Sequence, residues 1–231
     1  MTQNVTGKEG LSYTIVRSRR RTMSVEIQPH GNVVVRAPSR LPLYEIERFV
    51  ELKSVWIMRR VRDAEARKAL VPTLDGPRSF YHRGSVRTWG FTGDGADLIV
   101  PSRLRTENAA MRYVERWQRS EADQLFAEMV ADALPKIGVP GLRYQGLRVR
   151  TMRRRWGSCS STGHVTLNGH LIRVPDGCIR GVVVHEVCHL AHLHHGPAFH
   201  QLVADVYPEH ALADAILDAW THVLYQEPFT P

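Results

Sequence analysis

The sequence predicts an α+β fold, because strand-like and helical patterns occur in separate stretches of the chain. Residues 13–36 alternate between apolar and polar side chains with the period of two that β-strands have. Residues 43–67 and 106–136 instead place apolar side chains at helical spacing. The chain has 231 residues, 43% of them hydrophobic, and can therefore bury a core in each part. We expect a β-rich N-terminal domain with one helix over residues 1–105 and a second domain over residues 106–231.

The N-terminal domain begins with three strand-like segments, whose sequences are YTIVR, MSVEIQ and NVVVRAP. A turn at residues 29–32, Pro-His-Gly-Asn, separates the last two, and the pattern predicts a small antiparallel sheet. A single helix is expected from Leu43 to about Arg67. Residues 72–103 are richer in Gly and Pro and hold two short strand-like pieces, VRTWGF and DLIVP, so they are expected to end this domain.

The second domain is expected to open with a long amphipathic helix over residues 106–136, which ends near Gly138 and Pro140. Two or three short strands should follow, with a Ser/Gly turn at residues 160–163. Pro175 and Asp176 then have the character of a helix start.

The composition limits the cellular setting and the partners. A formal charge of +8 favours acidic partners, either nucleic acid or a nucleotide bound by the basic face, although a merely soluble basic protein is an equal alternative. The sequence has no apolar run of the length that a secretion signal or a membrane span needs, so we expect a cytoplasmic protein without membrane contact. Three cysteines without CxxC spacing, Cys159, Cys178 and Cys188, are expected to be reduced thiols.

The expected helix after Asp176 carries His185-Glu186-Val187-Cys188-His189, which is an HExxH pattern. Residues four apart lie on one helix face, one turn apart, so both imidazoles can reach one zinc ion at about 2.0–2.1 Å. Glu186 follows the first ligand and can take a proton from an activated water molecule. An unpaired Glu next to the apolar run Val182–Val184 would be costly, which weakens the alternative that these are ordinary core residues.

A hydrolytic zinc site needs a third protein ligand. The candidates that follow the motif are His192, His194, His195 and His200. On an unbroken helix His192 would lie about 10 Å along the axis from His185, too far to share its ion. His195 can return to the site if the chain bends at Leu193 and His194, a bend that Gly196-Pro197 makes credible. His195 also has the spacing of the third metzincin ligand and is preferred, with His194 as the remaining rival.

The segments RRRWGSCSSTGHVTLNGHLIRVP and VVVHEVCHLAHLHHGPAFH together resemble the YgjP-like metallopeptidase family, which is related to the SprT-like and WLM proteases. The resemblance extends to the N-terminal strands and to a helix with a tryptophan like Trp56. It implies a zincin-like catalytic domain in which the HExxH helix lies beside a small antiparallel sheet. It also implies that Zn²⁺ is held by His185, His189 and His195, with Glu186 as the catalytic base.

The chain departs from the family pattern around the third ligand, where His194, Gly196 and His200 replace the usual Asn, Ser and Trp. A second block of the family is also present, and the resemblance implies that it lies beside the metal. Four of its residues are substrate-binding candidates: Trp156, Gly157, Ser158 and Asn168.

The predicted activity is zinc-dependent cleavage of peptide bonds in a peptide or protein substrate. Two alternatives remain from the sequence. A metal-dependent nucleotide phosphohydrolase would suit the arginines at residues 153–155, although the chain has no P-loop. A DNA-associated protease of the SprT-like kind would use the basic face to bind nucleic acid.

Overall fold

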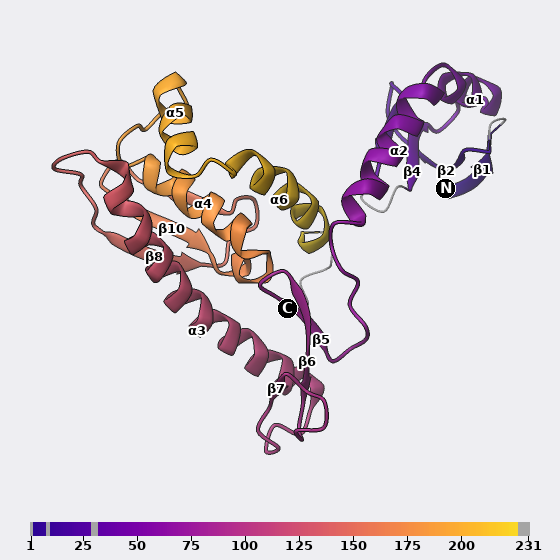
Figure 1. Ribbon diagram of the computed structural model, residues 1–231. Coiled ribbons are helices and arrows are strands. Elements are labelled where there is room, and N and C mark those ends of the chain that lie inside the picture. The colour runs from indigo at the N-terminus through magenta and orange to yellow at the C-terminus, as the bar shows by residue number, and fades with distance from the viewer. Residues whose placement is uncertain (1, 8–9, 29–31, 226–231) are drawn as a thin grey trace. The chain divides into compact units, whose positions relative to one another are not determined.

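The computed structural model describes residues 2–7, 10–28 and 32–225 (Figure 1). The chain divides into two compact units, one formed by residues 1–71 with 219–231 and the other by residues 72–218. The sequence predicted a boundary between residues 105 and 106 instead. That position falls inside the second unit, and the packing described below gives the reason.

A four-stranded mixed sheet forms the larger part of the first unit. Its strands are β1 (Thr2–Thr6), β2 (Ser12–Ser18), β3 (Ser24–Ile27) and β4 (Val33–Pro38), in the order β1-β2-β4-β3. β1 with β2 and β3 with β4 are antiparallel, but β2 and β4 run parallel. The prediction of an antiparallel sheet was wrong here, because β4 returns from β3 into the place beside β2. Residues 29–31 of the predicted turn lie outside the described residues.

Two helices cover this sheet where the sequence predicted one. They are α1 (Leu43–Leu52) and α2 (Ser54–Lys68), and they are separated by Lys53, whose φ of −108° and ψ of 5° leave the helical region. The apolar periodicity continues through the break, which is why the sequence did not reveal it. Sheet and helices share one core, which consists of Tyr13, Ile15, Val33, Val35, Ala37, Ile46, Val50 and Ile57.

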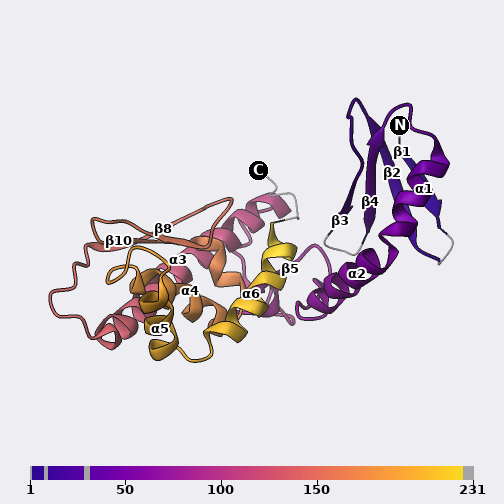
Figure 2. The same ribbon diagram turned by 90° about the horizontal axis from the view of Figure 1, so that it is seen from above.

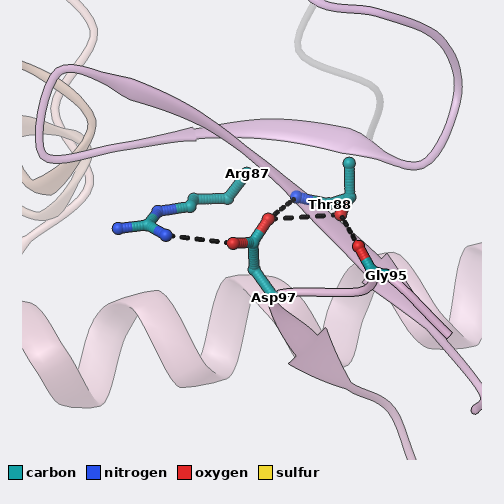
Figure 3. A network of polar contacts seen from close by, with 4 residues as sticks. All are labelled: Arg87, Thr88, Gly95 and Asp97. Carbon is teal, nitrogen blue, oxygen red and sulfur yellow. Dashed lines mark hydrogen bonds and ion pairs between the residues drawn. The ribbon is translucent and has the colours of Figure 1, made fainter. Parts of the chain in front are cut away.

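The second unit starts with a small sheet of β5 (Ser79–His82), β6 (Ser85–Gly90) and β7 (Leu98–Ile99). Asp97, directly before β7, closes the loop from β6 (Figure 3). Its carboxylate accepts hydrogen bonds from the Thr88 backbone N–H at 2.8 Å and from Arg87 Nη1 at 2.9 Å. These two bonds, the Thr88 bond first, lower the pKa of Asp97.

The long helix of the second unit is α3 (Glu107–Ala133), close to the predicted range of 106–136. The Thr106 side chain caps it by accepting from the Ala109 N–H at 3.2 Å. Val114 and Ala110 of α3 pack against Phe80 and Trp89 of the small sheet. This shared core joins residues 72–105 to the second unit, and no signal for it was found in the sequence.

A second three-stranded sheet lies beside the motif-bearing helix. Its strands are β8 (Gly146–Arg150), β9 (Gly157–Cys159) and β10 (His164–Asn168), in the order β8-β10-β9. β9 and β10 form the expected hairpin, but β10 and β8 are parallel. The predicted antiparallel sheet is therefore mixed, because β10 folds back between β9 and β8 and leaves β9 at the edge.

Three helices complete the second part of the chain: α4 (Asp176–Cys188), α5 (Pro197–Val206) and α6 (His210–Leu224). Figures 1 and 2 show α4 alongside α3 and the β8–β10 sheet, and α4 contacts α3, β9 and β10. Within the described residues, no helix combines the length and the apolar character that crossing a bilayer requires.

Candidate metal centre

The HExxH motif lies at the C-terminal end of α4. The helix starts after Pro175, and its first-turn Asp176 is bound by Arg83, whose Nε donates to Oδ1 at 2.8 Å. Its apolar residues, including Val182–Val184 and Val187, are buried. The helix ends at Cys188, and His189 is its C-terminal cap. Burial on several sides thus fixes the helix that presents His185 and His189 one turn apart.

The structure brings His195 to the same place. The ligand atoms of His185, His189 and His195 all lie within 4.8 Å of one another, and Nε2 of His195 is 3.1 Å from Nε2 of His185. Among the described residues, this is the one group of three or more His, Cys, Asp or Glu side chains that could hold a metal ion.

The chain returns to the helix through a short turn. Backbone bonds from the Ala191 and His192 N–H groups to the Cys188 carbonyl, each 3.0 Å, close the last turn of the helix. The Gly196 N–H then bonds to the His194 carbonyl at 2.8 Å, and Pro197 opens α5. His192 and His194 therefore lie in the connection, while His195 points back over α4.

The surroundings of His185 and His189 favour the neutral form of both imidazoles, which is the form that binds metal. Nδ1 of His189 lies 2.9 Å from the carbonyl oxygen of His192, which can only accept, so Nδ1 carries the proton and Nε2 keeps its lone pair. Burial, followed by the neighbouring histidines, lowers the pKa of His185 to about 4, and burial also lowers the pKa of His189. Both rings are thus deprotonated at neutral pH, as metal binding requires.

Phe199 of α5 supports all three rings, and it was not among the predicted site residues. Its side chain is fully buried, and its ring centroid lies 4.5 Å from that of His189, 5.0 Å from that of His185 and 4.8 Å from that of His195. The apolar periodicity of residues 197–206 is typical of a helix with one buried face, but nothing in the sequence placed that face against the histidines.

The donor set fits Zn²⁺. Three imidazole nitrogens with an open fourth position form a zinc arrangement typical of hydrolases, whereas Mg²⁺ and Ca²⁺ prefer oxygen ligands. Bonds of about 2.05 Å in a tetrahedron separate the ligand atoms by about 3.3 Å. The 3.1 Å between Nε2 of His185 and Nε2 of His195 is close to that separation, and all three ligand atoms lie within 4.8 Å of one another.

Glu186 lies next to this group and is buried, with 6% of its surface exposed. Burial raises the pKa of its carboxyl group to about 7 in the chain without a bound cation, and the charge of Arg155 opposes this shift. β9 lies directly against the side chain, because a Cβ atom on Gly157 would come within 2.6 Å of both Cγ and Oε1 of Glu186. Gly157 is therefore the residue type that lets the strand approach the carboxylate.

Two further residues lie near Glu186, and neither was among the predicted site residues. Cys159 ends β9, two residues after Gly157 and on the same face of the strand, whereas Arg155 lies in the loop before β9. The Glu186 charge contributes, after burial, to raising the pKa of the Cys159 thiol to about 11. Cys159 is thus a neutral thiol near the carboxylate, and Arg155 is an exposed cation near it.

Asn168, predicted to bind substrate, occupies a supporting position. Its side chain is fully buried, and its Nδ2 donates to the carbonyl oxygens of Met152 at 2.8 Å and Arg155 at 3.0 Å. Its backbone N–H also bonds to the Trp156 carbonyl at 2.8 Å. Asn168 therefore ties the 152–156 loop to β10, and this loop leads into Gly157.

The remaining two predicted substrate residues are half-buried neighbours of this strand. Trp156 directly precedes β9, and Ser158 is its middle residue, paired with Thr166 of β10. The structure thus gathers Gly157, Glu186 and the three histidines at one place, with Asn168 behind them. A substrate contact by Trp156, Gly157, Ser158 or Asn168 stays a prediction.

Comparisons with known proteins give a family and little beyond it. No curated protein matches the sequence. One solved structure, described as the metallopeptidase zymogen of Pyrococcus abyssi abylysin, is 21% identical, with a TM-score of 0.37 over 43% of this chain and 94% of that chain.

The family assignment rests on the sequence profile of the YgjP-like metallopeptidase domain, which matches residues 21–219. This range includes α4, the β8–β10 sheet and most of the first unit, so it exceeds half of the chain. The resemblance inferred from the motifs is thereby confirmed, and the chain belongs to the YgjP-like metallopeptidase family.

Proposed function

We propose that this protein is a zinc-dependent peptidase that hydrolyses peptide bonds with His185, His189 and His195 as metal ligands and Glu186 as general base. The observation that carries the proposal is the convergence of three imidazoles within 4.8 Å beside a buried carboxylate. Family membership supports a metal-dependent peptidase acting on a peptide or protein.

Glu186 moves the proton in this scheme. In its ionised form it takes a proton from the attacking water, and in its protonated form it gives that proton to the leaving amine. Burial favours this exchange near neutral pH, because it brings the pKa toward 7. Gly157 and the loop held by Asn168 keep the carboxylate in place while the proton moves.

Zn²⁺ held by the three histidines would polarise the scissile carbonyl and make the attacking water more acidic. Phe199 would hold the ligand rings in position and keep bulk water from their rear faces, because it contacts all three.

Arg155 favours one alternative substrate class. It is exposed, its charge acts on Glu186, and it ends the run Arg153–Arg155 beside the site, so a phosphate group could be bound there. A nucleotide phosphohydrolase is therefore the second candidate function. Binding of nucleic acid by the basic surface also stays a proposal, and it would fit a DNA-associated protease.

The test incubates the zinc-loaded protein with a denatured protein mixture and, separately, with nucleoside triphosphates. The Glu186→Gln variant is the matched control, because the amide has the same shape but does not accept the proton. We expect peptide fragments with the wild type, none with Glu186→Gln, and no phosphate release with either.

If the wild type releases phosphate and Glu186→Gln does not, the protein is a phosphohydrolase rather than a peptidase. Fragments produced equally by both proteins would remove Glu186 from the mechanism.

A further inference from the structure

The first unit contains a cavity of about 430 Å³ that has no part in the metal centre. It lies between Thr6, Gly7 and Leu11 on one side and helix α1 on the other. The described lining includes Leu11, Tyr13, Tyr44, Glu47, Val50 and Glu51. This volume lies in the range of small-molecule pockets. The walls combine apolar side chains with carboxylates, which is a pattern of ligand sites rather than of packing defects.

Tyr13 supplies an unused polar group at this cavity. The residue is 3% exposed, and its hydroxyl is buried without a hydrogen-bond partner among the described residues. Buried hydroxyl groups are nearly always paired, because an unpaired one loses its water without compensation. A bound polar group would supply the partner that the described part of the chain does not.

The charges around the cavity indicate the sign of that group. Glu47 and Glu51 lie one helical turn apart on α1 and both line the cavity, and Arg48 is the cationic side chain among the described lining residues. The Glu47 charge contributes, after burial, to raising the pKa of Tyr13, so the carboxylate acts on the phenol. Carboxylates together with a hydroxyl oxygen accept hydrogen bonds, and the exposed ring of Tyr44 can face a cation.

We propose that this cavity binds a primary ammonium group on a short aliphatic stem, with Glu47 and the Tyr13 hydroxyl oxygen holding the ammonium and Leu11 and Val50 contacting the stem. The group is either a lysine side chain of a polypeptide or a free alkylamine, since both present the same chemistry. All lining residues belong to the first unit, so the proposal does not depend on the proposed peptidase activity.

The test titrates pentylammonium into the ¹⁵N-labelled full-length chain and follows amide chemical shifts. Pentan-1-ol, which has the same stem without the charge, is the control ligand. Three variants are compared with the wild type: Glu47→Gln, Tyr13→Phe and Glu65→Gln. Glu65 is an exposed residue of α2 outside the cavity, so its variant makes the same change in net charge without touching the site.

We expect saturable shifts at residues 6–13 and 44–54 with pentylammonium and none with pentan-1-ol. Glu47→Gln should weaken binding about tenfold or more, since it removes a charge-assisted bond, and Glu65→Gln should not. Tyr13→Phe should also weaken binding while leaving the melting temperature unchanged or higher, because the hydroxyl that it removes is buried without a partner among the described residues. A purely structural tyrosine would lower the melting temperature instead.

A lysine-containing tripeptide with blocked ends separates the two sources. Tighter binding of the peptide than of pentylammonium assigns the site to polypeptides, and the reverse assigns it to small amines. Either outcome supports the proposal. Absence of saturable binding by both, equal binding of pentan-1-ol, or equal weakening by Glu65→Gln would overturn it.

Discussion

At the scale of single residues, the absence of a side chain at Gly157 allows β9 to approach Glu186 closely. β9 approaches Glu186 so closely that a methyl group at position 157 would overlap the carboxylate. Its backbone has no positive φ, so alanine is acceptable to the strand itself. The close approach therefore concerns the position of the base and not the folding of β9.

Gly157→Ala should consequently lower kcat for peptide hydrolysis by about 10- to 100-fold, the cost of displacing a catalytic group by roughly 1 Å. Zinc content should not change, because the three atoms that a Cβ at residue 157 would meet most closely all belong to Glu186. Steady-state kinetics and elemental analysis of the same sample check both statements. An unchanged kcat would mean that Glu186 does not depend on β9 for its position.

The third ligand can be tested by comparing two neighbouring histidines. His195→Ala should weaken zinc binding by about a hundredfold or more, because it removes one of three ligand atoms. His194→Ala should change it by less than about threefold, since His194 lies in the turn. Zinc titration against a competing chelator measures both, and a larger loss at His194 would move the ligand assignment by one residue.

Spacing alone was enough to propose the metal centre. The four-residue interval between His185 and His189 fixes a common helix face, and Gly196-Pro197 indicates that the chain bends before α5. The contacts of Glu186 with Gly157 and of Asn168 with the 152–156 loop join segments distant in sequence. Hydrophobic periodicity does not predict contacts between segments so far apart in the sequence. The family resemblance predicted that Gly157 and Asn168 lie beside the metal, but it did not predict their individual roles.

At the scale of elements, the β9–β10 hairpin presents Gly157 to the site, and its turn tolerates little change. Gly163 has a φ of +92°, and a Cβ atom there would overlap the carbonyl oxygen of Arg143. The Gly163 carbonyl also accepts from the Gln145 N–H at 2.8 Å, which connects the turn to the segment before β8.

Gly163→Ala should therefore lower the free energy of unfolding by about 2 kcal/mol or more, through backbone strain and the overlap with Arg143. Gly95→Ala is a suitable control, because Gly95 has a φ of +77° but open space around its Cβ position. Urea denaturation of both variants separates strain alone from strain with overlap. Equal losses would show that the contact with Arg143 adds nothing.

Elements were predicted better than their pairing. α3, α4 and the β9–β10 hairpin lie close to their predicted positions, because capping and turn residues mark them locally. The parallel pairs β2 with β4 and β8 with β10 were missed. In both sheets a strand returns between two others, and the alternation of side chains is the same for either direction of pairing.

At the scale of the whole molecule, stability should depend on pH through buried histidines. Burial lowers the pKa of His170, in the 3-10 helix Gly169–Arg173, to about 4, with the Arg173 charge as a second cause. The unfolded chain has the ordinary value of about 6.5 and so binds more protons between these two values. The stabilisation is complete above about pH 6.5 and is lost as the pH falls toward 4.

Lowering the pH from about 7.5 to about 5 should therefore destabilise the wild type more than His170→Gln, by up to about 2 kcal/mol. Comparing the two proteins cancels the contributions of the other titrating groups, including the histidines of the metal centre. Urea denaturation at both pH values gives the difference. Parallel losses in the two proteins would show that His170 is not held neutral by burial.

The composition of residues 72–103 did not show that this segment packs with the second unit. A boundary after residue 105 followed the Gly- and Pro-rich segment, yet Phe80, Trp89 and Val100 share a core with Ala110 and Val114 of α3. Apolar residues in a short sheet show that it will be buried but not which helix will cover it.

We propose that one zinc ion and Glu186 act together, and measuring zinc content and peptide hydrolysis in the same samples tests this. We expect about one zinc per chain in both the wild type and Glu186→Gln, with hydrolysis in the wild type alone. Activity in a metal-free or magnesium-only wild type, or full activity in Glu186→Gln, would exclude a joint role of zinc and Glu186.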